Sequence, residues 1–254
     1  MSKSGSRITG LAGRVGQIFH QIFHIYRRWW IYILPFAAIL LIPVDLIDSL
    51  VDAEIEKLPD GKLSDWIVFS TLAGALASTS LLGQVFLAGA IGLSLLHTQD
   101  GNPPKLRWLA RHISYGRLIA VDLLFLVVVI IGWIFLILPG MLALVFFALV
   151  GPVVEIEDRG IRGAFRRSFG LVRKDFWLVF WVLFLTQLGG HYLGSGINYV
   201  AISIFGDARI VEAIATGSTS VLIEPLFAIA TVLLTMRLSG RKPPPVAAPH
   251  QPAS

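Results

Sequence analysis

The longest stretch without a charged residue decides which class of protein this sequence can form. Residues 66–96 are 31 consecutive positions without Asp, Glu, Lys or Arg. About 20 helical residues are enough to cross a hydrocarbon core of about 30 Å. Further apolar runs follow along the chain, so the sequence predicts an all-α integral membrane protein rather than a soluble, fibrous or disordered one.

The composition and the charge agree with this class. Hydrophobic residues make up 55% of the 254 residues and charged residues 15%. Cysteine is missing from the sequence, which excludes a disulfide scaffold and any zinc or iron–sulfur site built on cysteine. The net charge of +5 could attract nucleic acid. The basic residues lie beside apolar runs, however, so anionic membrane lipid is the expected partner and nucleic acid is not.

Six apolar runs predict a bundle of six transmembrane helices, which we place in residues 29–238. The fifth is expected to be loosened by its glycines at 189, 190, 194 and 196, and a tight turn is expected at 138–140, between the third and fourth. A Pro-rich tail at 239–254 is expected to be disordered. The predicted spans are 29–50, 66–96, 118–138, 141–154, a fifth from Phe176, and 219–236.

The distribution of Lys and Arg predicts the topology. Of the 21 basic residues, 18 lie in 1–28, 97–117, 155–175 and the stretch from Arg237 onward. The other three lie in two acidic connections, 51–65 and 206–215. The positive-inside rule places the first set in the cytoplasm. Both termini are therefore expected inside, and a family resemblance carried by residues 138–180 implies that the membrane is the bacterial cytoplasmic membrane.

Three basic segments have the periodicity of amphipathic helices that lie in the headgroup plane: 7–30, 104–117 and 159–175. The first of them forms an expected N-terminal unit at 1–28. Alternatively, these helices cap the cytoplasmic end of the bundle and touch little lipid. The residues expected to contact lipid headgroups are Arg27, Arg28, Arg162, Arg166, Arg167, Arg173 and Lys174.

Polar groups at membrane depth are costly, so Glu224, Asp122 and His191 form a candidate intramembrane site. Glu224 precedes Pro225, and a proline inside a membrane helix frees a backbone carbonyl. We expect the Glu224 carboxyl to face the bundle interior. Its role could be purely structural, through a hydrogen bond to Gln84, Gln187, Asn198 or His191. Asp122 could simply reach the cytoplasmic interface or pair with Arg117. Asp45 and Asp48 are interpreted as the outer end of the first span.

No motif predicts catalysis, a metal site or a cofactor. His20 and His24 have the i, i+4 spacing of metal ligands on a helix, but a solvated polar face explains them better. The segment 193–196 superficially resembles an intramembrane serine protease motif, but Leu193 replaces the required glycine. We therefore expect a protein without enzymatic activity.

The segment 138–180 carries a family resemblance. It reads Leu-Pro-Gly at 138–140, then Pro-Val-Val-Glu at 152–155, Ala-Phe-Arg-Arg-Ser at 164–168 and Phe-Trp at 176–177. This pattern resembles the membrane-domain family found in some glycerophosphoryl diester phosphodiesterases, and 224–238 looks like the last span of that family. The resemblance implies a stand-alone relative of the membrane portion. Only a Pro-rich tail follows the sixth span, so the phosphodiesterase activity is not carried over.

Two functions follow from these features. The first is a membrane scaffold or lipid-contacting module that works with partner proteins in the membrane. The second is a transporter for a small or lipidic solute, which would use Glu224 and the glycine-broken fifth span. A polar cavity that reaches Glu224 would favour the transporter, and a solid bundle would favour the scaffold.

Overall fold

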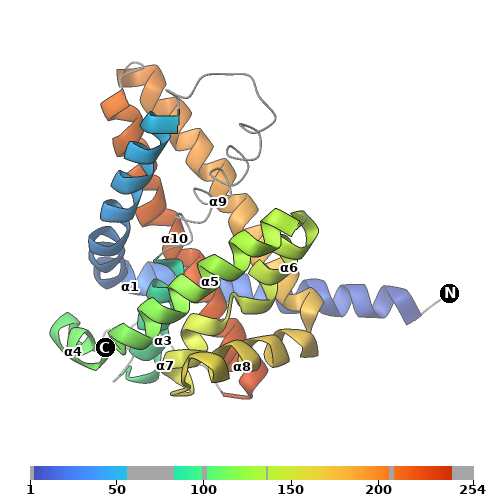
Figure 1. Ribbon diagram of the computed structural model, residues 1–254. Helices are drawn as coiled ribbons and strands as arrows, with labels where there is room; N and C mark the ends of the chain where they lie inside the picture. The colour runs from blue at the N-terminus through green and yellow to red at the C-terminus, as the bar shows by residue number, and fades with distance from the viewer. Residues whose placement is uncertain (1–2, 56–82, 99–101, 136, 206–208, 242–254) are drawn as a thin grey trace, which may run out of the picture.

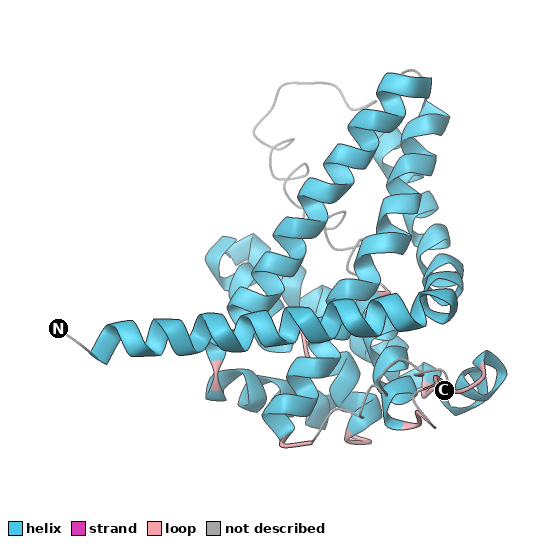
Figure 2. Cartoon of the chain, turned by 180° about the vertical axis from the view of Figure 1, so that it is seen from behind, coloured by secondary structure: helices cyan, strands magenta, loops and turns pink. Residues whose placement is uncertain are grey.

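The computed structural model describes residues 3–55, 83–98, 102–135, 137–205 and 209–241 (Figure 1). The regular elements in these residues are all helices, as the sequence predicted (Figure 2). Residues 66–82 of the predicted second span lie outside the described residues, as do residues 56–65 of the acidic connection after the first span and most of the C-terminal tail. The helices are α1 (Lys3–Ile55), α3 (Gln84–Leu96), α4 (Leu106–His112), α5 (Tyr115–Phe135), α6 (Ile137–Phe147), α7 (Val150–Ile156), α8 (Ile161–Lys174), α9 (Phe176–Phe205) and α10 (Arg209–Ser239).

Four stretches of the described helices are long and apolar enough to cross a membrane. They are Gly10–Pro43 in α1, Pro139–Ile156, which joins α6 and α7, the whole of α9, and Ile214–Ser239 in α10. A fifth candidate combines α4 with the first part of α5, which are bent by 73° at their junction. The fold is thus that of a helical membrane protein with four or five membrane-length apolar segments in the described residues.

The first helix is longer than the sequence analysis indicated. α1 runs without a break for 53 residues, through both the predicted interfacial segment and the predicted first span. Both overall views show it as one horizontal and one upright part (Figures 1 and 2). Pro35 and Pro43 lie inside it, and each removes a helical hydrogen bond, which is the usual cause of such a bend.

The predicted turn at 138–140 is wrong, because all three residues belong to α6. Proline is tolerated in the first turn of a helix, where its missing N–H would have no partner in any case. The predicted fourth span is also divided, because a turn at residues 148–149 separates α6 from α7. This turn is buried, so the two short helices still behave as one apolar segment.

α10 lies at the centre of the bundle and packs on α1, α9 and α3. Its last turns alternate small and branched side chains, which lets neighbouring helices approach from several directions. Ala228, Ile229, Ala230 and Val232 are all completely buried. The hydroxyl groups of Thr231 and Thr235 donate to backbone carbonyls one turn earlier, so these polar side chains are satisfied inside the helix.

Two glycines join α3 and α7 backbone to backbone. A Cβ on Gly151 would lie 2.2 Å from the Val85 carbonyl oxygen, and a Cβ on Gly89 would lie 3.3 Å from the Gly151 carbonyl oxygen. A side chain on α7 at residue 151 would therefore collide with the main chain of α3. The pair fixes the position of α3, which carries Gln84 at its first residue.

Candidate functional site

A polar cleft of about 480 Å³ lies between α9 and α10. Gln187, His191, Ser195 and Asn198 line it from α9, and these positions follow a helical spacing of three and four residues. Thr216, Thr219, Ser220 and Glu224 line it from α10. Two of the three residues of the predicted intramembrane site, Glu224 and His191, are thus together in one cleft.

The glycines of α9 bring its backbone close to α10. A Cβ on Gly190 would lie 2.5 Å from Cγ2 of Ile223, and a Cβ on Gly194 would lie 2.7 Å from Cγ2 of Thr219. Gly189 and Gly196, by contrast, have nothing within 4 Å of such an atom. The expectation of a glycine-broken fifth span is wrong, because α9 is continuous and two of its glycines form a small-xxx-small contact instead.

Glu224 faces the interior of the bundle, as predicted from its sequence position. The Gln84 side chain donates a hydrogen bond to its carboxyl group, and the Asp45 carboxyl lies close enough to interact with its charge. Gln84 is one of the four partners named from the sequence, and the other three line the same cleft. The Glu224 carboxyl thus connects α10 with α3 beside α1.

Several buried polar atoms of the cleft have no hydrogen-bond partner among the described residues. They are Oδ1 of Asn198, Oγ1 of Thr219 and Oε2 of Glu224. All three residues line the polar cleft. A buried polar atom without a partner costs about 1–3 kcal/mol, so this clustering indicates that water or a solute supplies the missing hydrogen bonds.

Asp122 belongs to a different contact. Its Oδ2 accepts a hydrogen bond of 2.9 Å from the backbone N–H of Gly83, immediately before α3. Gly83 has φ +91°, a left-handed conformation that glycine adopts readily. The expected pair with Arg117 is wrong, because Arg117 contacts the exposed Asp158 at 2.7 Å. Asp122 therefore positions the start of α3, next to Gln84.

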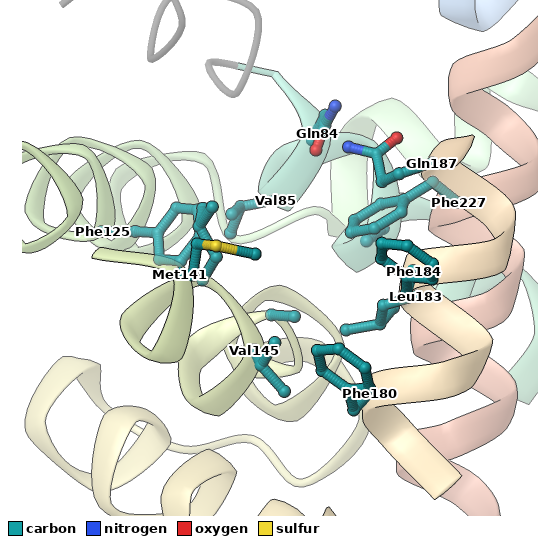
Figure 3. Close-up of a pocket in the computed structure, with 13 residues that line it drawn as sticks. Gln84, Val85, Phe125, Met141, Val145, Phe180, Leu183, Phe184, Gln187 and Phe227 are labelled. Atoms are coloured by element: carbon teal, nitrogen blue, oxygen red, sulfur yellow. The ribbon is translucent and has the colours of Figure 1, made fainter. Parts of the chain in front are cut away.

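An apolar cavity of about 180 Å³ adjoins this region. Figure 3 shows aromatic and aliphatic side chains around it, including Phe125, Met141 and Phe227, with the amides of Gln84 and Gln187 together at its upper edge. Gln187 lines both the cavity and the polar cleft. The polar and apolar spaces therefore meet at these two amide side chains.

The basic face of α8 is largely exposed. Arg162, Arg166, Arg173 and Lys174 lie on the outside, whereas Ala164, Ser168 and Leu171 are buried against the bundle. Arg167 differs, because its Nε donates to Glu157 at 2.9 Å. Burial of the Glu157 carboxyl opposes its ionisation, but hydrogen bonds and charges from Arg167 and Arg159 outweigh this effect and lower its pKa.

The apolar side of the predicted N-terminal amphipathic helix packs against the rest of the bundle. Val15, Ile18, Ile22 and Ile25 are buried, and Arg14 forms an ion pair with Asp175 at the end of α8. This is the arrangement expected of a bundle cap. Arg27 is exposed and Arg28 is half-buried, so lipid contact by these two residues stays a prediction. His20 and His24 also lie on the exposed side, and no group of metal-ligating side chains occurs among the described residues.

Three parts of the site are not predicted by the sequence. Asp45 was interpreted only as a marker of the span end, although it lies beside Glu224. Thr219 carries no sequence signal, because a single threonine in a helix usually bonds its own backbone. Gly190 and Gly194 were noticed, but their spacing of four residues was not read as a packing motif.

These features define a polytopic helical membrane protein with a polar cleft between two of its long helices, α9 and α10. The chain belongs to the family described as "Domain of unknown function (DUF7847)", which it matches over residues 48–240. No curated protein matches the chain. No solved structure matches it either.

Proposed function

We propose that this chain is a membrane transporter for a small or lipidic solute, held in the polar cleft between α9 and α10. The observation that carries the proposal is the set of three unpaired buried polar atoms on Asn198, Thr219 and Glu224, which line the same cleft. The cleft volume of about 480 Å³ lies within the range of about 300–1,000 Å³ typical of ligand pockets. A purely structural network would instead satisfy its polar groups internally.

The topology that we propose has six spans with both termini in the cytoplasm of a bacterial cell. The partition of basic residues supports this arrangement. The four or five membrane-length segments among the described residues are compatible with it. We assign no enzymatic step to the protein, and we retain its relationship to the phosphodiesterase membrane domains as a proposal.

Proteoliposomes test the transport proposal. We would measure the transbilayer movement of a fluorescent phospholipid and the uptake of radiolabelled amphiphiles with cationic, neutral and anionic head groups. We expect movement of at least one probe above that in protein-free vesicles. Glu224→Gln should fold and insert normally, because glutamine keeps the shape and hydrogen-bonding capacity, but it should lose this movement.

The matched control is Asp158→Asn, which removes one acid at an exposed position outside the cleft. It should transport like the wild-type protein. If no probe moves faster than in protein-free vesicles, or if Glu224→Gln transports normally, the cleft is not a transport site.

A second candidate function is a lipid-contacting scaffold that works with partner proteins. The exposed basic face of α8 favours it, because each basic residue near an anionic surface contributes about 1 kcal/mol. Replacing Arg162, Arg166 and Arg173 with Gln should reduce the anionic lipid that co-purifies with the full chain, measured by native mass spectrometry. If the amount of co-purified anionic lipid is unchanged, the basic face of α8 does not bind lipid headgroups.

A further inference from the structure

We propose that the solute is an alkylammonium amphiphile, a molecule with an N–H-bearing cationic head and a short apolar tail. This inference rests on the transport function proposed above and names the substrate class of the same site. The head would occupy the polar cleft at Glu224, and the tail would occupy the apolar cavity shown in Figure 3.

The charge of the cleft favours a cationic head. Glu224 lines it, and the Asp45 carboxyl lies within electrostatic range of Glu224. Among the described residues that line the cleft there is no Lys or Arg, and His191 is the one basic side chain. An anionic head would find no Lys or Arg partner among these residues and would lie beside carboxyl groups instead.

The unpaired atoms favour a head that donates hydrogen bonds. Oε2 of Glu224 and Oδ1 of Asn198 are both acceptors, and neither has a donor in the part of the chain that the structure describes. Oγ1 of Thr219 can also accept a hydrogen bond. A primary ammonium group at Glu224 carries N–H donors, as a lysine side chain does, and water would serve the acceptors of Thr219 and Asn198, which lie at least one helical turn farther along the cleft. A quaternary ammonium group has the charge but none of these donors.

The apolar cavity is large enough for a short hydrocarbon tail. A dry apolar cavity of about 150 Å³ in another protein binds benzene, and this cavity has a volume of about 180 Å³. Phe125, Met141, Val145 and Phe227 contribute apolar surface to it (Figure 3). Each buried methylene group of the tail would add to the affinity by the hydrophobic effect.

Two amides join the head site to the tail site. Gln187 lines both spaces, and Gln84 lines the apolar cavity while it donates to Glu224. Figure 3 shows the two side chains next to each other, above the aromatic rings. One molecule can therefore place its polar end at Glu224 and its apolar end among the rings.

The test measures equilibrium binding of radiolabelled octylammonium to the full chain in lipid nanodiscs at pH 7, with empty nanodiscs subtracted. An alkylammonium group resembles the lysine side chain, whose pKa is about 10.4, so it is charged at this pH. We expect saturable binding, with weaker competition from methylammonium, octyltrimethylammonium, octyl glucoside and octyl sulfate. Stronger competition by octyl sulfate or octyl glucoside than by octylammonium would overturn the cationic assignment. Equal competition by methylammonium would overturn the tail site.

Two variants and one control locate the binding. Glu224→Gln should weaken octylammonium binding roughly tenfold or more, because it removes the acid that can ionise opposite the cationic head group. Val145→Phe should weaken it by filling the tail cavity. Asp158→Asn, which removes an exposed acid elsewhere, should bind as the wild-type protein does. Wild-type affinity in Glu224→Gln, with wild-type thermal stability, would overturn the proposal.

The flux and binding assays distinguish this proposal from the transport proposal. If vesicles move the phospholipid or octyl glucoside while octylammonium does not bind, the substrate class is wrong and transport stands. If octylammonium binds through Glu224 and no probe moves, the ligand class stands and transport is wrong. If no probe binds or moves, both proposals are wrong.

Discussion

Replacing Gly190 with alanine tests whether the glycines of α9 serve close packing. The new methyl group would lie 2.5 Å from Cγ2 of Ile223 on α10. This atom belongs to a β-branched side chain with little rotamer freedom inside a helix, so relief requires the two helices to move apart. The same substitution at Gly189 meets nothing within 4 Å, although the two residues are adjacent in α9.

The expected changes in the free energy of unfolding have opposite causes at the two positions: the new methyl group has space at residue 189 and is crowded at residue 190. Gly→Ala within a helix stabilises by about 0.5–1 kcal/mol where the methyl group has space. Overpacking in a closely packed contact costs about 1–3 kcal/mol. Gly189→Ala should therefore raise the free energy of unfolding by about 0.5–1 kcal/mol. Gly190→Ala should be less stable than Gly189→Ala by about 1–3 kcal/mol.

Both variants would be compared in detergent by denaturant unfolding, followed by tryptophan fluorescence and circular dichroism. Gly194→Ala and Gly196→Ala form a second matched pair, because a Cβ on Gly194 would lie 2.7 Å from Thr219 and one on Gly196 has open space. Equal stability of Gly190→Ala and Gly189→Ala would refute the close-packing argument. It would also mean that Gly190 does not set the distance between α9 and α10 beside the cleft.

Three further predictions concern other contacts. Asp122→Leu should lose about 1–3 kcal/mol of stability in chemical unfolding, because a buried backbone N–H loses its acceptor, whereas Asp122→Asn should keep most of it. When the free energy of unfolding is measured against pH, Glu157 should contribute stability that is complete above its unfolded pKa of about 4.3. This stability should be lost as the pH falls through the lower pKa of the folded state, and the loss should be smaller in Arg167→Gln. In the cysteine-free chain, Asp60→Cys should react with an impermeant thiol reagent in intact cells and Arg166→Cys should not, and the reverse pattern would contradict the proposed topology.

The sequence predicted the class of fold because it follows from hydropathy alone. It also predicted that Glu224 faces inward, since an acidic side chain in contact with lipid would be costly. Its hydrogen bond with Gln84 was among the partners considered. The cleft itself could not be predicted, because α9 and α10 line it together and the sequence does not give their relative rotation.

Two errors show which information a single sequence lacks. The glycines of α9 look like helix breakers until the neighbouring helix is known, and then Gly190 and Gly194 become contact points. The expected pair of Asp122 with Arg117 failed partly for a local reason and partly because the backbone of Gly83, 39 positions away, donates to the Asp122 carboxyl group. The two residues are five positions apart, whereas side chains on one face of a helix are three or four apart. Distant contacts decided both outcomes, through α10 in one case and Gly83 in the other.

The contact between α3 and α7 constrains how this family can vary. Residue 151 has room only for hydrogen, because the Val85 carbonyl oxygen occupies the place of a side chain. Even alanine there would require the start of α3 to move, and Gln84 with it. Relatives that keep the cleft should therefore keep glycine at the position equivalent to Gly151. In relatives with a larger residue at that position, we expect that α3 no longer holds Gln84 against Glu224.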